Sequence, residues 1–306
     1  MSTTHDHNHG AGQANRTRLL IAIAIIGGFF ILEVVGALIS GSLALLADAG
    51  HMLSDLVGLL IAFVALTVAA RPATDRQTFG FARAEVFGAL INGLLLLGIA
   101  VFVAIEGVGR LLSPGTTEVL AVPMLVIGVA GLLANVAALL VVRAGAATSI
   151  GMRGAYLEVL GDLFGSIATI IAAGVILLTG FVQADAIGSL VIAALIAPRA
   201  FVLLRDVVRV LSNATPVETN IAHIREHIVK YPGVVAVHDV HVWSITSGAK
   251  VFTAHIVVDD ETLEPARAGT LLDSLDSCLA EHFDVAHSTF QLEPEAHAAH
   301  EEIPHP

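Results

Sequence analysis

Six stretches of apolar residues, each about as long as a membrane-spanning helix, occupy the first two thirds of the chain. A helix needs about 20 predominantly apolar residues to cross the hydrocarbon core of a bilayer. Only 14% of all residues are charged, compared with about 25% in an average soluble domain. The stretches are Leu19–Ile39, Leu43–Ala70, Ala84–Leu112, Val119–Val142, Ala155–Thr179 and Ala184–Leu204. The sequence therefore predicts a multi-pass α-helical membrane protein with six transmembrane helices.

The arginines predict how these helices are oriented. Nine arginines lie on one side of the predicted membrane domain, whereas only Arg110 lies on the other. Basic residues collect on the cytoplasmic side of membrane proteins, so both termini are expected in the cytoplasm. No small-residue cleavage pattern follows the first apolar stretch, which is therefore interpreted as a retained span rather than a signal peptide. We expect a protein of the cell (inner or plasma) membrane.

The last third of the chain has the composition of a soluble, acidic domain. Residues 213–306 hold 4 basic and 15 acidic residues, whereas residues 1–212 hold 11 and 12. An acidic surface argues against binding to nucleic acid, whose phosphates require basic partners. It suits either cation binding or simply solubility.

The spacing of apolar residues in this domain predicts its secondary structure: a helix at 217–231, strands at 234–245 and 251–259, a helix at 265–283 and a strand at 286–292. This order suggests a small α+β domain with an antiparallel sheet and helices on one face.

These observations divide the chain into four parts. Residues 16–211 form the membrane domain and residues 212–295 the cytoplasmic domain, whereas residues 1–15 and 296–306 are tails that contain histidine. Tails of this composition are expected to be disordered, and they either collect metal loosely or have no role.

The second and fifth apolar stretches each carry two residues that can bind a metal ion. His51 and Asp55 are four positions apart, as are Glu158 and Asp162, so each pair shares one face of a helix. Ionisable groups at membrane depth are costly and by default mark an ion path. Four donors of this kind suit a tetrahedral Zn²⁺ ion, with Asp48 as a possible additional ligand. The alternative is that each acid caps a helix or extends to the membrane surface.

The cytoplasmic domain carries a second group of candidate ligands. His238, His255 and His287 lie on or beside predicted strands, together with Asp239 and His241 as less secure candidates. His238 and His255 lie on the two arms of a predicted hairpin, so they could be neighbours across strands. Metal binding is predicted here, although exposed histidines on strands are often incidental.

Two other histidines are weaker candidates for metal binding. His223 and His227 are four positions apart on a predicted helix. Cys278 is the only cysteine of the chain, which excludes an intramolecular disulfide. This cysteine is interpreted as a small buried apolar residue, and no cysteine-based metal site is expected.

Several motifs resemble those of a known family. The runs SGSLALLADAGHMLSD, FGFARAEVFGALING and RGAYLEVLGD resemble the cation diffusion facilitator family of zinc transporters, of the bacterial cobalt-zinc-cadmium efflux type. The runs HDVHVWSITSG and HSTFQLE fit the cytoplasmic domain of that family. The resemblance covers about residues 16–295. It implies a ferredoxin-like cytoplasmic domain, a homodimer, and exchange of cytoplasmic zinc for protons by alternating access rather than an enzymatic activity.

The resemblance also assigns roles to particular residues. The family's transport site falls on His51, Asp55 and Asp162, and its cytoplasmic metal ligands fall on His238, His255 and His287. The fourth transport position is usually histidine in zinc members, but here it is Glu158. A carboxylate makes the site harder and favours ions such as Mn²⁺. Zinc remains the expected substrate and the expected regulatory ligand. Cd²⁺ and Co²⁺ are further possible substrates. A Mn²⁺ or Fe²⁺ exporter and a non-transporting membrane metal sensor remain alternatives.

Overall fold

The computed structural model of the chain describes residues 9–69, 71–113, 118–146, 150–246 and 249–298. Within these ranges, side chains are described for all residues except 9–23, 59, 62, 63, 65, 66, 69, 144–146, 150–155, 157, 158 and 298. The predicted tails therefore lie largely outside the described residues. The chain divides into two compact units, one of Met1–Leu60 with Ile91–Val202 and one of Ile61–Leu90 with Leu203–Pro306.

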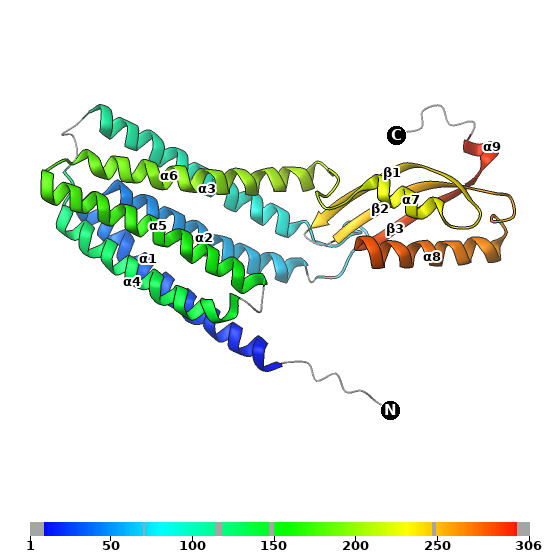
Figure 1. Cartoon of the computed structure of the whole chain (residues 1–306), viewed down its shortest axis with the longest axis horizontal. Helices are drawn as coiled ribbons and strands as arrows, with labels where there is room; N and C mark the ends of the chain where they lie inside the picture. The colour runs from blue at the N-terminus through cyan, green and yellow to red at the C-terminus, as the bar shows by residue number, and fades with distance from the viewer. Residues whose placement is uncertain (1–8, 70, 114–117, 147–149, 247–248, 299–306) are drawn as a thin grey trace. The chain divides into compact units, whose positions relative to one another are not determined.

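Six long helices account for the six predicted apolar stretches. They are α1 (His9–Ser40), α2 (Leu43–Ala69), α3 (Ala84–Leu112), α4 (Ala121–Ala146), α5 (Ile150–Thr179) and α6 (Gln183–Leu211), drawn from blue to yellow-green in Figure 1. Among the described residues, four helical segments within α3 to α6 are long and apolar enough to cross a membrane, and Ala24–Ser40 is a shorter apolar segment. Helix α6 continues through Pro198, as membrane helices often do when neighbouring groups satisfy the freed carbonyl.

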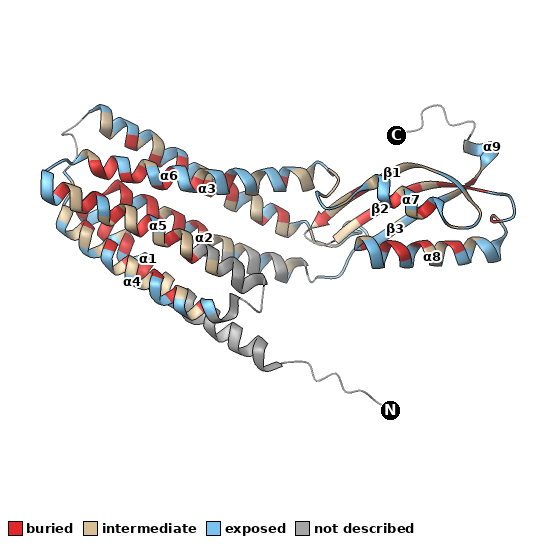
Figure 2. Cartoon of the chain, viewed as in Figure 1, coloured by how far each residue is buried: buried red, intermediate tan, exposed pale blue. Residues whose placement is uncertain are grey.

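The first unit packs through small residues on the inner faces of its helices. Helix α4 packs against α1 and α5, and alanines such as Ala44 and Ala173 are fully buried. Small side chains let membrane helices approach closely. Large apolar side chains such as Leu178, Leu38 and Ile105 are exposed on the outside, and Figure 2 shows exposed positions in pale blue along these helices. This distribution suits a bundle whose outer surface contacts lipid rather than water.

The cytoplasmic domain is a small sheet with two main helices. Its elements are α7 (Ile221–Val229), β1 (Val234–Thr246), β2 (Ala249–Val258), α8 (Pro265–Phe283), β3 (Val285–Pro294) and α9 (Glu295–Ala298). Strands β1 and β2 pair antiparallel, whereas β2 and β3 pair parallel. The expectation of an antiparallel sheet is therefore wrong for β3. A tight hairpin reverses the chain between β1 and β2, whereas the crossover through α8 returns it in the direction of β2.

The two helices pack on this sheet through apolar residues at helical spacing. Ile224 and Ile228 of α7 and Leu275 of α8 are almost fully buried in one core with Phe252 of β2. Helix α7 begins after Asn220, whose side chain accepts a hydrogen bond from the His223 N–H. The core fixes which faces of α7 and α8 point away from the sheet.

Candidate metal-binding sites

The membrane domain brings together three of its four predicted ligands. His51 and Asp55 on α2 and Asp162 on α5 each offer one donor atom, and these three atoms lie within 4.8 Å of one another. The His51 Nε2 atom lies 3.2 Å from Asp162 Oδ1 and 3.7 Å from Asp55 Oδ2. His51 and Asp162 are buried, whereas Asp55 is partly exposed. We call these three residues the bundle cluster.

The contacts of His51 conflict in a way that a metal ion would resolve. Besides the carboxylate of Asp162, His51 Nε2 contacts the Nη1 atom of Arg199 on α6 at 3.0 Å. The carboxylate requires a donor and the guanidinium requires an acceptor, and one ring nitrogen cannot be both. A cation bound between the carboxylates and the imidazole would remove this conflict, because Nε2 and the carboxylate oxygens would then all donate electron pairs to the same ion.

Glu158 and Asp48 are the other two candidate ligands near this cluster, and the structure does not place either of them in it. The backbone of Glu158 lies in α5, one helical turn before Asp162, but its side chain is outside the described residues, so its role remains a prediction. Asp48 is buried and interacts with the buried Glu33 of α1. Asp48 is therefore engaged with α1 in this structure.

A second cluster lies in the cytoplasmic domain. Strand pairing places His238 opposite His255, and a donor atom from each lies within 4.8 Å of a carboxylate oxygen of Glu293. Glu293 Oε1 lies 2.6 Å from His238 Nε2 and 3.6 Å from His255 Nδ1. Glu293 is almost fully buried, and a buried carboxylate needs cationic partners or a metal ion. We call these three residues the sheet cluster.

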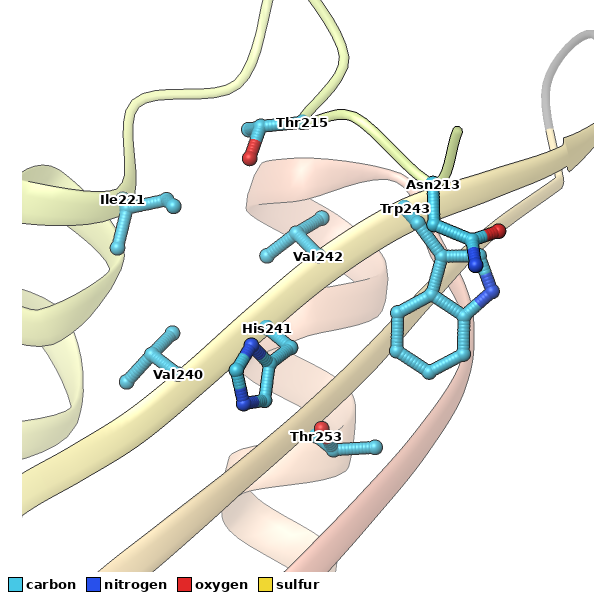
Figure 3. Close-up of a pocket in the computed structure, with 8 residues that line it drawn as sticks. All are labelled: Asn213, Thr215, Ile221, Val240, His241, Val242, Trp243 and Thr253. Carbon is cyan, nitrogen blue, oxygen red and sulfur yellow. The ribbon is translucent and has the colours of Figure 1, made fainter. Parts of the chain in front are cut away.

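Asp239 and His241 border the sheet cluster. The register of β1 shifts between His238 and His241, and Asp239 takes a φ of 53° there, which is a conformation that Asp tolerates at a bulge. The Asp239 carboxylate lies 3.9 Å from His255 Nε2 and 3.5 Å from His241 Nε2. His241 is exposed and lines a pocket of about 540 Å³ together with Val240, Trp243 and others, shown in Figure 3.

His287 lies apart from the sheet cluster within the described chain. It pairs with Val251 across β2, whereas His255 pairs with Gln291. Four residues of strand separate these positions by about 13 Å. Its predicted role as a ligand therefore remains a prediction, and Glu293 is the third donor that the structure adds.

The sequence reasoning missed Glu293 and Arg199. Glu293 lies within the run HSTFQLE, where an acidic residue directly after the apolar Leu292 was the available signal. Arg199 stands beside Pro198 in the sixth apolar stretch, where a fixed charge in an apolar helix was itself a sign of function. Neither signal names a partner, because both contacts join distant parts of the chain.

Two family models match nearly the whole chain. The model described as the cation efflux transmembrane domain matches residues 19–212. The model described as the cation efflux protein cytoplasmic domain matches residues 216–295. The chain belongs to the cation efflux family. This membership confirms the resemblance in the sequence motifs, and with the six helices and the α+β domain it confirms the predicted fold class.

Similar proteins of this family are found in several bacteria. The metal cation efflux system protein CzcD of Cupriavidus metallidurans is 39% identical over 293 residues, covering 96% of this chain and 90% of CzcD. The zinc transporter ZitB of Escherichia coli is 39% identical, with 95% and 92% covered. The cadmium, cobalt and zinc/H(+)-K(+) antiporter of Bacillus subtilis is 37% identical, with 96% and 93% covered.

Proposed function

We propose that this cation efflux protein exports a divalent metal ion, with zinc as the preferred substrate, from the cytoplasm in exchange for protons. The observation that carries the proposal is the bundle cluster, in which His51, Asp55 and Asp162 converge between two helices of the membrane domain. The names of the relatives support it, since they describe metal cation efflux, zinc transport and a cadmium, cobalt and zinc antiporter.

Metal and protons compete for the same atoms in this mechanism. Only neutral imidazole and ionised carboxylates coordinate a metal ion, so binding releases protons, and protons arriving from the other side displace the metal. A rocking movement of helices around a fixed site would expose the bundle cluster first to one side and then to the other. No covalent chemistry is required, and we propose no enzymatic activity.

The donor set determines which ion is preferred. The imidazole of His51 favours borderline ions such as Zn²⁺, Co²⁺ and Cd²⁺, whereas an additional carboxylate from Glu158 would favour Mn²⁺ or Fe²⁺. A manganese or iron exporter is therefore the second candidate. Competition among these ions for purified protein, with a Glu158→His variant measured alongside, separates the two. Preference for Mn²⁺ in the wild type that turns to Zn²⁺ in the variant would favour the second candidate.

A transport assay tests the function directly. Inside-out membrane vesicles that contain the protein should accumulate Zn²⁺ when their lumen is acidic, and the uptake should stop when a protonophore collapses the pH gradient. Vesicles without the protein are the control. Zinc binding without any uptake under either condition would support a membrane metal sensor instead.

The contact between Arg199 and His51 leads to a prediction about affinity. The Arg199 guanidinium lies 3.0 Å from the ring nitrogen that would bind the metal, so its charge repels the ion and its N–H occupies the lone pair. Arg199→Gln should tighten Zn²⁺ binding by about tenfold, or about 1.4 kcal/mol, and should slow release. Calorimetric titration of the purified protein measures the affinity, and vesicle uptake measures the turnover.

A second variant displaces the same arginine without removing it. A Cβ added at Gly161 would collide with the Arg199 guanidinium, which is the movable end of a flexible side chain. Gly161→Ala should therefore tighten zinc binding in the same direction. Arg205→Gln is the matched control, because Arg205 lies on the same helix in an exposed pair with Asp206. Unchanged affinity in both Arg199→Gln and Gly161→Ala would show that the arginine does not compete with the metal.

We further propose that the protein is a homodimer in the cell membrane with both termini in the cytoplasm, as the arginine distribution and the family's cytoplasmic domain suggest. The sheet cluster would bind cytoplasmic zinc as a regulatory ligand, with His287, Asp239 and His241 as further candidates. Its buried carboxylate, Glu293, supports this role.

A further inference from the structure

Helices α7 and α8 each carry, four positions apart, two residues of types that can bind a metal ion. His223 and His227 lie on α7, and Cys278 and His282 lie on α8. Residues at this spacing share one helix face, and the two helices contact each other beside the sheet. The fold therefore places two pairs of donors on adjoining helical surfaces, away from the sheet cluster.

The side chains of these four residues contact one another through His227. The Cys278 Sγ atom lies 3.9 Å from His227 Nδ1. The ring of His227 lies 4.7 Å from that of His223 and 5.6 Å from that of His282, measured between centroids. Two ligands of one tetrahedral Zn²⁺ ion, at about 2.3 Å for sulfur and 2.0–2.1 Å for nitrogen, stand about 3.3–3.6 Å apart. The distance of 3.9 Å between Cys278 Sγ and His227 Nδ1 is already close to that spacing.

His282 is oriented by its own helix as a metal ligand would be. Its Nδ1 atom lies 3.1 Å from the carbonyl oxygen of Cys278. Since a carbonyl oxygen only accepts, Nδ1 must donate, which leaves the lone pair on Nε2. Histidines that bind metal characteristically donate their other N–H to a carbonyl or carboxylate in this way.

The cluster can be reached from solvent. Cys278 is buried, but with Glu281 and His282 it borders a surface depression of about 490 Å³. His223 and His282 are exposed, so an ion in solvent can reach both rings.

Aromatic packing alone does not account for the arrangement. The rings of Phe283 and His227 pack edge-to-face with centroids 5.3 Å apart, and this contact accounts for the orientation of the His227 ring. It does not explain why the thiol of Cys278 and the neighbouring imidazoles gather around the same ring.

We propose that Cys278, His227 and His282, with His223 as fourth donor, form a binding site for a thiophilic divalent ion such as Zn²⁺ or Co²⁺. A thiolate with imidazoles selects such ions over Mg²⁺, Ca²⁺ and Mn²⁺. The bound ion links α7 to α8, and this site does not depend on whether the protein transports metal.

The single cysteine makes the test specific. Purified full-length protein, reduced with a phosphine that contains no thiol, is titrated with Co²⁺ while its absorption spectrum is recorded. A thiolate-to-cobalt charge-transfer band in the near ultraviolet can arise only from Cys278, because the chain holds one cysteine. The band should saturate with Co²⁺, disappear when Zn²⁺ is added, and be absent in Cys278→Ser.

The histidine variants test the rest of the ligand set. His227→Ala and His282→Ala should each weaken Co²⁺ binding at this band by at least about tenfold. Ser277→Ala, at an exposed neighbouring position, and the double change His238→Ala with His255→Ala should leave the band unchanged. Absence of the band in the folded wild type would overturn the site. Equal affinity in wild type and both histidine variants would also overturn it, even if Cys278→Ser failed to fold.

Discussion

Replacing Asp162 by asparagine should reduce zinc uptake into inside-out vesicles by about 100-fold or more, which corresponds to about 2.7 kcal/mol. Asp162 is buried, and its Oδ1 atom lies 3.2 Å from His51 Nε2. Asparagine keeps the shape of the side chain and removes the charge that would hold a divalent ion. The loss should therefore appear both in uptake and in zinc affinity measured by calorimetry.

The variant Asp206→Asn is the control for this prediction. Asp206 lies on α6 in an exposed pair with Arg205, where the loss of one charge matters little. Asp55→Asn should reproduce the loss seen with Asp162→Asn, because Asp55 offers the third donor of the bundle cluster. Normal transport by both cluster variants would place the transport site elsewhere in the protein.

Replacing Asp185 by alanine should lower the free energy of unfolding by about 3–5 kcal/mol. The Asp185 carboxylate is buried at the start of α6 and accepts hydrogen bonds from the Ser42 hydroxyl at 2.5 Å and from the Leu43 and Ala44 N–H groups at 2.8 and 3.1 Å. It also lies 3.5 Å from Arg110 Nη1. Alanine would leave the first N–H groups of α2 without acceptors, and Arg110 would keep its ion pair with Glu106 but lose the one with Asp185.

Thermal unfolding of the purified protein in detergent measures this effect. Asp206→Ala, an exposed change on the same helix, should shift the midpoint little. The unfolding midpoint of Asp185→Asn should lie between those of Asp185→Ala and Asp206→Ala, because the amide oxygen still accepts a hydrogen bond. An unchanged midpoint in Asp185→Ala would mean that α2 is held by packing alone. Since α2 carries His51 and Asp55, the destabilised protein should also lose transport at a lower temperature than the wild type.

The location of the helices was predictable because it depends on local composition. The predicted ranges Ala84–Leu112 and Pro265–Phe283 coincide with α3 and α8. The boundaries of α5 and α6 were less accurate, since both helices continue beyond their apolar stretches. Apolar length locates the part of a helix inside a bilayer, but not the polar turns that extend it into water.

The candidate sites were likewise predictable only where local geometry determines which residues meet. The pairing of His51 with Asp55 follows from helical periodicity, and the pairing of His238 with His255 follows from the hairpin. The edge of the sheet that β3 joins does not follow from residue pattern, because a strand after a helical crossover can join either edge. The proximity of Glu293 to both histidines depends on β3 lying beside β2.

The sequence by itself determined that this protein has a six-helix membrane domain, an acidic cytoplasmic domain, and metal-binding residues spaced to share helix faces. These properties depend on neighbours within a few positions, where helix and strand geometry dictate which side chains meet. Only the tertiary structure decided which faces meet. The contact of Arg199 with His51 joins residues 148 positions apart, and that of Cys278 with His227 joins residues 51 apart. Such contacts depend on how whole helices pack, and no local pattern specifies that packing.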